Sequence, residues 1–152
     1  MRKILAAVLS VVSMFGGLLP AQPAQAAVAA TLAVTTLEDL IKNDGKCSLR
    51  EAMQRAFDNA ATNPTNDCPS SPSGNTTINF AVAGTIVISN GVGYGALPDT
   101  INTVVLNGPI TLDATKANQI LLDVESSGKL SLINVTIKNA AFTAIDSRGE
   151  LN

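Results

Sequence analysis

The chain has 152 residues, of which 46% are apolar, 3% aromatic and 14% charged, a length that suits one domain. A formal charge of −2, without clustered Lys or Arg, argues against a nucleic-acid partner because phosphate binding needs grouped basic side chains. The chain has no histidine, which excludes His-based catalytic triads and His-ligated metal sites.

Residues 1–26 have the pattern of a secretory signal peptide. Arg2 and Lys3 precede an apolar run over residues 4–19, and a stretch of small residues ends in Ala-Gln-Ala at positions 24–26. A membrane anchor is the alternative, but the run is short for a bilayer and a cleavage motif follows it. We predict cleavage between Ala26 and Ala27, and a mature chain that is secreted or held at the cell surface without a membrane span.

Residues 27–75 are predicted to form an N-terminal cap that opens with a strand. Thr-Leu-Ala-Val-Thr-Thr at positions 31–36 alternates in the manner of a half-buried strand. Residues 62–75 are rich in Asn, Pro and Ser and are predicted to be a loop.

The only two cysteines are Cys47 and Cys68. Export would place them in an oxidising compartment, where one intrachain disulfide would close a loop of about 22 residues and contribute roughly 3 kcal/mol. Free thiols, a metal pair and an intermolecular bond are the alternatives. Two cysteines without histidine make a poor zinc site, so we favour the disulfide.

A helix is predicted from residue 49 to residue 60. Ser48 and Glu51 have the spacing of a capping box, in which each side chain satisfies a backbone N–H of the other. Apolar residues then recur at helical spacing: Leu49, Ala52, Met53, Ala56, Phe57 and Ala60. The neighbours Arg50 and Glu51 could form a catalytic or binding pair. We favour a structural role, with Glu51 as the cap and Arg50 as a local ion pair or backbone anchor.

From residue 76 onward the sequence is a repeat of short β-branched strands. Four phrases of the form Gly-x-[Ile/Leu]-x-[Ile/Leu] begin at Gly84, Gly108, Gly128 and Gly149, which are 24, 20 and 21 residues apart. The segments 124–130 and 145–151 match position by position. Two asparagines, Asn134 and Asn139, are expected at corners, where a turn role is favoured over a ligand contact.

A period near 21 with inward apolar residues predicts a right-handed parallel β-helix of about three coils over residues 76–152. A leucine-rich repeat lacks support because its Leu and Asn scaffold is missing, and a β-sandwich does not predict a fixed period. We expect helix 49–60 to cover the open first coil. We also expect further coils beyond residue 152.

Residues 47–52, Cys-Ser-Leu-Arg-Glu-Ala, spell the motif that names the CSLREA domain. The chain resembles this family over about residues 31–152, including Asn-Asp-Gly at 43–45 and Thr-Ile-Asn-Phe at 77–80. The resemblance implies a right-handed, pectin-lyase-like β-helix on secreted or surface-anchored proteins, some similar to polymorphic outer-membrane proteins. It implies no established reaction. Many members have a cysteine before the motif. Here residue 46 is Lys, which leaves Cys68 as the partner of Cys47.

Two functions are compatible with these features. The favoured one is a non-enzymatic adhesin-like or matrix-binding scaffold without a cofactor, whose partner is an extracellular glycan or the cell-envelope surface. The alternative is a Ca²⁺-dependent polysaccharide lyase, or a hydrolase or other glycan-active enzyme, whose site lies in the further coils. A lyase needs carboxylates to hold Ca²⁺ and a basic side chain near the sugar proton. Its candidate residues are Asp113, Asp123, Asp146, Lys138 and Arg148. They do not recur in the repeat alignment, which places Asp123 with Ala144 and Asp113 with Ile133.

The single tyrosine, Tyr94, lies in a Gly-rich run over residues 91–95. A glycan-stacking role is conceivable for its ring, but an ordinary loop position is favoured. The run is not a phosphate loop, because no Lys-Ser/Thr pair follows it.

Overall fold

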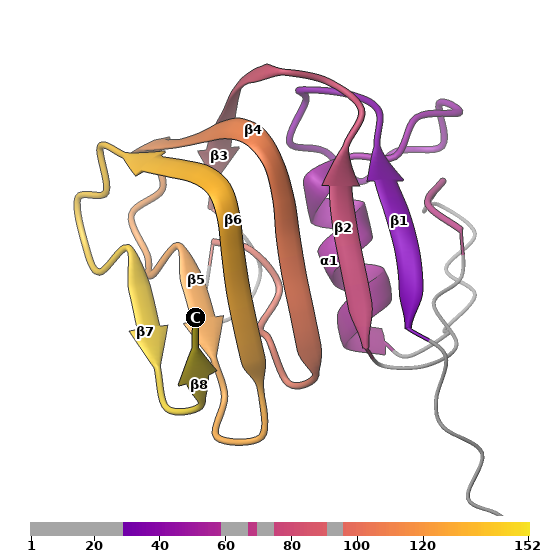
Figure 1. The fold of residues 1–152 in the computed structure, drawn as a ribbon. Helices are drawn as coiled ribbons and strands as arrows, with labels where there is room; N and C mark the ends of the chain where they lie inside the picture. Colours follow the sequence, from indigo (N-terminus) through magenta and orange to yellow (C-terminus); the bar gives the residue numbers. More distant parts are fainter. Residues whose placement is uncertain (1–28, 59–66, 70–74, 91–95) are drawn as a thin grey trace, which may run out of the picture.

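A computed structural model describes residues 29–58, 67–69, 75–90 and 96–152 as a mostly β protein with one helix among the described elements (Figure 1). In chain order the elements are β1 (Ala30–Val34), α1 (Leu49–Asp58), β2 (Thr76–Phe80), β3 (Gly84–Ser89), β4 (Thr103–Lys116), β5 (Leu122–Val124), β6 (Lys129–Lys138), β7 (Ile145–Ser147) and β8 (Glu150–Leu151). The predicted signal peptide, its cleavage site at Ala26 and Ala27, and Tyr94 lie outside the described residues.

All the pairings between the described strands are parallel. The larger sheet has the order β1-β2-β4-β6-β8, with β3 added against the second half of β4, and β5 and β7 form a separate pair. Strands β1, β2, β4 and β6 stand side by side in Figure 1. Parallel neighbours need long crossovers rather than hairpins, so each repeat must leave the sheet and return to it.

Apolar side chains of successive strands occupy the same row of the sheet. Leu32, Ile78, Leu106 and Leu132 are paired in register along β1, β2, β4 and β6. The first three are buried and Leu132 packs against the same core. A second row joins Ile86, Leu112 and Ile137. Burial of such a side chain stabilises the fold by about 1.5–3 kcal/mol, so these rows are a main source of stability in the repeats.

Strands β4 and β6 are each bent into two halves. Their pairing register shifts between Asn107 and Ile110, at the point where β6 passes through Asn134. Asn134 has a positive φ of 55° and Asn139 one of 58°, the left-handed conformation that asparagine tolerates better than most residues. The expected corners therefore coincide with backbone turns. At the same bend Gly108 lies against Phe80, which an added Cβ would approach to 3.0 Å.

The repeat alignment predicted from the four glycine phrases is wrong in its register, except between the strands that follow the last two glycines. Gly84 pairs with Ile110 rather than with Gly108, an offset of 26 residues, and Leu106 pairs with Leu132, also 26 residues on. An offset of 21 holds between β6 and β8, where Leu130 pairs with Leu151. The first two glycines lie near the second half-strands and the last two precede first half-strands, so the phrases mark different positions in the repeat.

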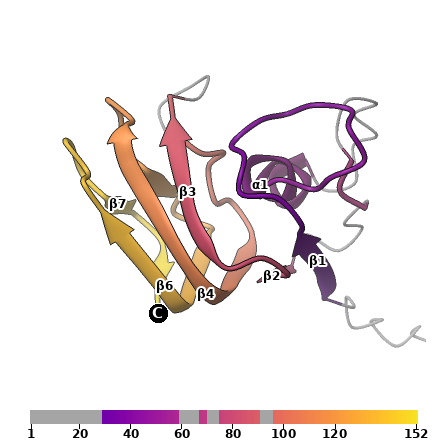
Figure 2. The same ribbon diagram turned by 90° about the horizontal axis from the view of Figure 1, so that it is seen from above.

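Helix α1 packs against β1 and β2 at the first-strand end of the larger sheet. Figure 2 shows the helix end-on beside these two strands, away from β6 and β7. Its apolar side chains Leu49, Ala52, Met53 and Ala56 are buried in the same core as the strand rows. The helix is described to Asp58, so the last two predicted helical positions are outside the described residues. Phe57 is half-buried.

Candidate functional site

The start of α1 has the geometry of a reciprocal capping box. The Ser48 N–H donates to Glu51 Oε2 at 2.9 Å, and the Glu51 N–H donates to Ser48 Oγ at 3.2 Å. Glu51 is only 1% exposed, and its Oε1 accepts the N–H of Lys42 at 3.0 Å. Glu51 therefore joins the helix start to the preceding loop.

The disulfide Cys47–Cys68 is present and buried at the same end of α1. Arg55 Nε donates to the carbonyl oxygen of Cys68 at 3.1 Å. Asp67 Oδ2 accepts the N–H groups of Asp44 and Gly45, at 2.5 and 2.7 Å. The second cysteine segment is thus attached both to the helix and to the turn that leads into it.

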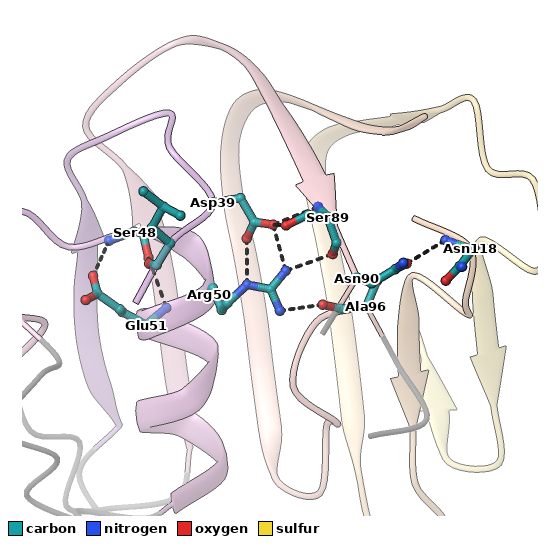
Figure 3. Close-up of polar contacts among 9 residues, drawn as sticks. Asp39, Ser48, Arg50, Glu51, Ser89, Asn90, Ala96 and Asn118 are labelled. Atoms are coloured by element: carbon teal, nitrogen blue, oxygen red, sulfur yellow. Dashed lines mark hydrogen bonds and ion pairs between the residues drawn. The ribbon is translucent and has the colours of Figure 1, made fainter. Parts of the chain in front are cut away.

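Arg50 makes the densest set of polar contacts around the helix. Its Nε and Nη2 donate to Asp39 Oδ1 and Oδ2 at 2.9 and 2.6 Å, a two-pronged ion pair (Figure 3). The two side chains are only 10% and 3% exposed. Nη2 also donates to the carbonyl of Ser89 at 3.0 Å, and Nη1 to that of Ala96 at 2.5 Å. Arg50 is therefore both an ion pair and a backbone anchor.

Asp39 completes this cluster at the end of β3. Its Oδ2 accepts the N–H of Ser89 at 2.8 Å and the Ser89 hydroxyl at 3.0 Å. Both carboxylate oxygens thereby accept hydrogen bonds, so Asp39 holds the end of β3 in place. Sequence reasoning missed Asp39, because nothing distinguishes it from the nearby acids Glu38 and Asp44.

A cavity of about 420 Å³ opens next to the Arg50–Asp39 pair. The exposed side chains of Leu40 and Ile41 line it together with Gln54 and Pro98. The cavity combines a fixed, buried ion pair with aliphatic walls. This arrangement suits binding of an apolar group better than acid–base chemistry.

The carboxylate Asp113 is paired with Lys138 and not, as predicted, aligned with Ile133. The two residues are opposite each other in β4 and β6, and Lys138 Nζ lies 3.2 Å from Asp113 Oδ2. Hydrogen bonds from the side chains of Thr115 and Asn139 and from the Thr115 N–H, with Lys138 nearby, hold the pKa of Asp113 well below its ordinary value. Asp113 is therefore a carboxylate whose negative charge is stabilised by Thr115, Asn139 and Lys138.

Asp123 is aligned with Asp146 and not, as predicted, with Ala144. Four residues separate β5 from β6 but only two separate β7 from β8, so the two repeats slip by two positions. Asp123 is 2% exposed and accepts Arg148 Nη2 on both oxygens at 3.0 Å. Arg148 also reaches Glu125 at 2.8 Å, and the hydrogen bond and charge of Asp123 raise the pKa of the guanidinium.

Four of the five residues considered for glycan cleavage form two separate ion pairs, Asp113 with Lys138 and Asp123 with Arg148. The fifth, Asp146, lies opposite Asp123 in β7. Within the described residues, no three acidic, His or Cys side chains are grouped so that they could hold a metal ion. Neither does any helix of the described part have the length and hydropathy to cross a membrane.

Comparisons with known protein families, with curated proteins and with solved structures find no match for this chain.

Proposed function

We propose that this protein is a non-enzymatic, secreted or cell-surface scaffold built as a right-handed parallel β-helix with an N-terminal cap, as its resemblance to the CSLREA-domain family implies. The observation that carries the proposal is the row Leu32, Ile78, Leu106 and Leu132, in which successive repeats pair in parallel and stack apolar residues. Helix α1 covers the first strands of this row. Stacked repeats of this kind present long, regular surfaces for binding.

The cysteine pair and the amino-terminal segment support an extracellular location. A buried disulfide persists in oxidising compartments and is rare in reducing ones. The Ala-Gln-Ala pattern at positions 24–26 adds an export signal.

The engagement of the carboxylates favours binding over catalysis. The lyase alternative needs carboxylates that are free to hold Ca²⁺. Asp113 is held by Lys138, and Asp123 by Arg148. These contacts fit structural ion pairs between neighbouring strands.

The best surface for a matrix glycan is a shallow groove of about 660 Å³ across three adjacent strands. Its lining comes from residues 84–85, 109–111 and 134–136, none of which is charged or aromatic. Thr85, Thr111 and Thr136 are paired in register along it. Their hydroxyls repeat about every 4.8 Å, the strand spacing, and can both donate to and accept from sugar hydroxyls.

Binding of the exported protein to immobilised neutral polysaccharides tests this function. We expect retention that falls when Thr85, Thr111 and Thr136 are all changed to Val, which keeps the branched shape but removes the hydroxyl. Changing Thr77, which lies on β2 and does not line the groove, to Val is the control and should leave retention unchanged. Absence of retention on every polysaccharide, or Ca²⁺-dependent release of unsaturated sugars, would contradict the proposal.

A further inference from the structure

A second cavity lies between α1 and the segment that leads into β4. Two hydrogen bonds attach this segment, residues 96–102, to the helix, one before and one after the residues that line the cavity. Arg50 Nη1 donates to the carbonyl of Ala96, and Asn102 Nδ2 donates to the carbonyl of Ala56 at 3.0 Å. The cavity has a volume of about 300 Å³. Its walls are made by Gln54, Phe57, Pro98 and Asp99.

This cavity adjoins the 420 Å³ cavity beside Arg50, since Gln54 and Pro98 line both. Together they form a groove along one side of α1, which we call the helix groove. It runs from Leu40 and Ile41 at one end to Asp99 at the other. Leu40 and Ile41 are 49% and 42% exposed, which is high for large aliphatic side chains.

Asp99 supplies a negative charge at its end of the helix groove. Within the described residues its carboxylate has no hydrogen bond or ion pair. Desolvation raises the pKa of Asp99, and the charges of Asp123 and Glu125 raise it further, whereas Arg148 lowers it. Arg148 is already engaged with Asp123 and Glu125. A cation in the groove would therefore meet an unpaired carboxylate in a negative field.

The other walls at this end also suit a cation with an alkyl stem. The ring of Phe57 can interact with an ammonium or guanidinium group. Pro98 offers an apolar surface for the methylene groups of Lys or Arg. The amide of Gln54 donates to Asp58 Oδ2 at 2.8 Å, which leaves its carbonyl oxygen as an acceptor.

We propose that the helix groove binds an extended peptide segment of a partner protein, with a Lys or Arg side chain beside Asp99 and an aliphatic side chain beside Leu40 and Ile41. The length of the groove sets their spacing. The seven helical rises from Arg50 to Phe57 span about 10 Å, which equals about three residues of extended peptide. The recognised pattern is therefore an aliphatic residue and a basic residue three positions apart.

A binding experiment on the exported protein tests this site. The probes are blocked tetrapeptides, Leu-Gly-Gly-Arg and its reverse Arg-Gly-Gly-Leu, and Leu-Gly-Gly-Glu serves as the charge control. Amide chemical shifts are followed by NMR. We expect one of the arginine peptides to bind and to shift the amides of Phe57 and Asp99, with an affinity that falls as salt is raised. The glutamate peptide should not bind.

Matched variants locate the contact. Asp99→Asn keeps the shape of the side chain and should weaken binding about tenfold, which corresponds to loss of one partly desolvated charge contact. Asp146→Asn, which changes an acid on β7 outside the groove, should leave the affinity unchanged. Equal binding of the arginine and glutamate peptides, no binding of either arginine peptide, or an unchanged affinity in Asp99→Asn would overturn the proposal. Glycan retention uses a different face, so the two proposals fail separately.

Discussion

The region around α1 and the region of repeated strands are held together by different interactions. Around α1, buried polar groups link segments distant in sequence: Arg50 to Asp39, Ser89 and Ala96, and Cys47 to Cys68. In the repeats, backbone pairing and apolar rows recur from strand to strand. The basic partners of the ion pairs there are about half exposed, both in Lys129–Glu150 and in the pair of Arg148 with the buried Asp123.

This difference predicts how much stability each region loses when a single residue is substituted. When one aliphatic side chain in a stacked row is shortened, the row loses only the buried apolar area of that side chain. A buried ion pair adds little stability compared with a pair of apolar residues in its place. Removal of only one partner, however, leaves the other charge buried without compensation and costs stability. We therefore expect the first region to depend on single residues, and the second to respond gradually.

The largest expected effect is that of Arg50→Leu. It removes the partner of Asp39, whose side chain is only 3% exposed, and should lower the free energy of unfolding by about 3–5 kcal/mol. Urea denaturation measures the change. Lys42→Ala, which removes an exposed pair with Asp44, is the control and should cost under about 1 kcal/mol. Similar losses of unfolding free energy in the two variants would contradict the claim that the buried Arg50–Asp39 pair is more important than the exposed Lys42–Asp44 pair.

The apolar row should respond to Leu106→Ala with a loss of about 3 kcal/mol, within the range for buried Leu to Ala changes. Leu106 is fully buried at the centre of its row, whereas Ile133 on the neighbouring strand is 46% exposed. Ile133→Ala is therefore the control, and it should change the denaturation midpoint little. If both variants lost the same stability, the row would not be the core of the repeats.

Removing the disulfide should cost about 3 kcal/mol, because the bond closes a loop with a sequence separation of 21. The double variant Cys47→Ala and Cys68→Ala avoids a free thiol. Thermal unfolding should show the loss. Adding reductant should destabilise the natural protein and leave the double variant unaffected. An unaltered melting temperature in the double variant would show that the bond does not stabilise this end of the fold.

The smallest effect is a pH-dependent gain from Asp99→Asn. Because the pKa of Asp99 is raised in the fold, its ionised form costs stability, and the cost disappears as the pH falls through the raised pKa to below the ordinary value of 3.8. The variant should melt slightly higher than the natural protein at neutral pH and at the same temperature near pH 3. A variant that melts lower at neutral pH would mean that Asp99 is paired in solution.

Local features of the sequence were sufficient for the helix, its cap and the disulfide. Ser48 and Glu51 are three residues apart, and only two cysteines exist, so few alternatives competed. Arg50 could be predicted as an anchor, but not its partners, since Ser89 and Ala96 are 39 and 46 residues away. The first strand was predicted from its alternation, and the repeated strands from their glycine phrases. Their register was missed because turn lengths differ between repeats, which moved Asp123 opposite Asp146 and Asp113 opposite Lys138.

The central claim is that successive repeats pair in parallel with the register of Val105 opposite Ser131. Double-cysteine cross-linking measures this directly. Neighbouring strands place paired Cα atoms about 4.8 Å apart, within reach of a disulfide, whereas a shift of two residues places them beyond about 7 Å. We predict that Cys at positions 105 and 131 forms an additional bond on mild oxidation and that Cys at 105 and 133 does not. Bond formation only in the second pair, or in neither, would contradict this register of neighbouring repeats.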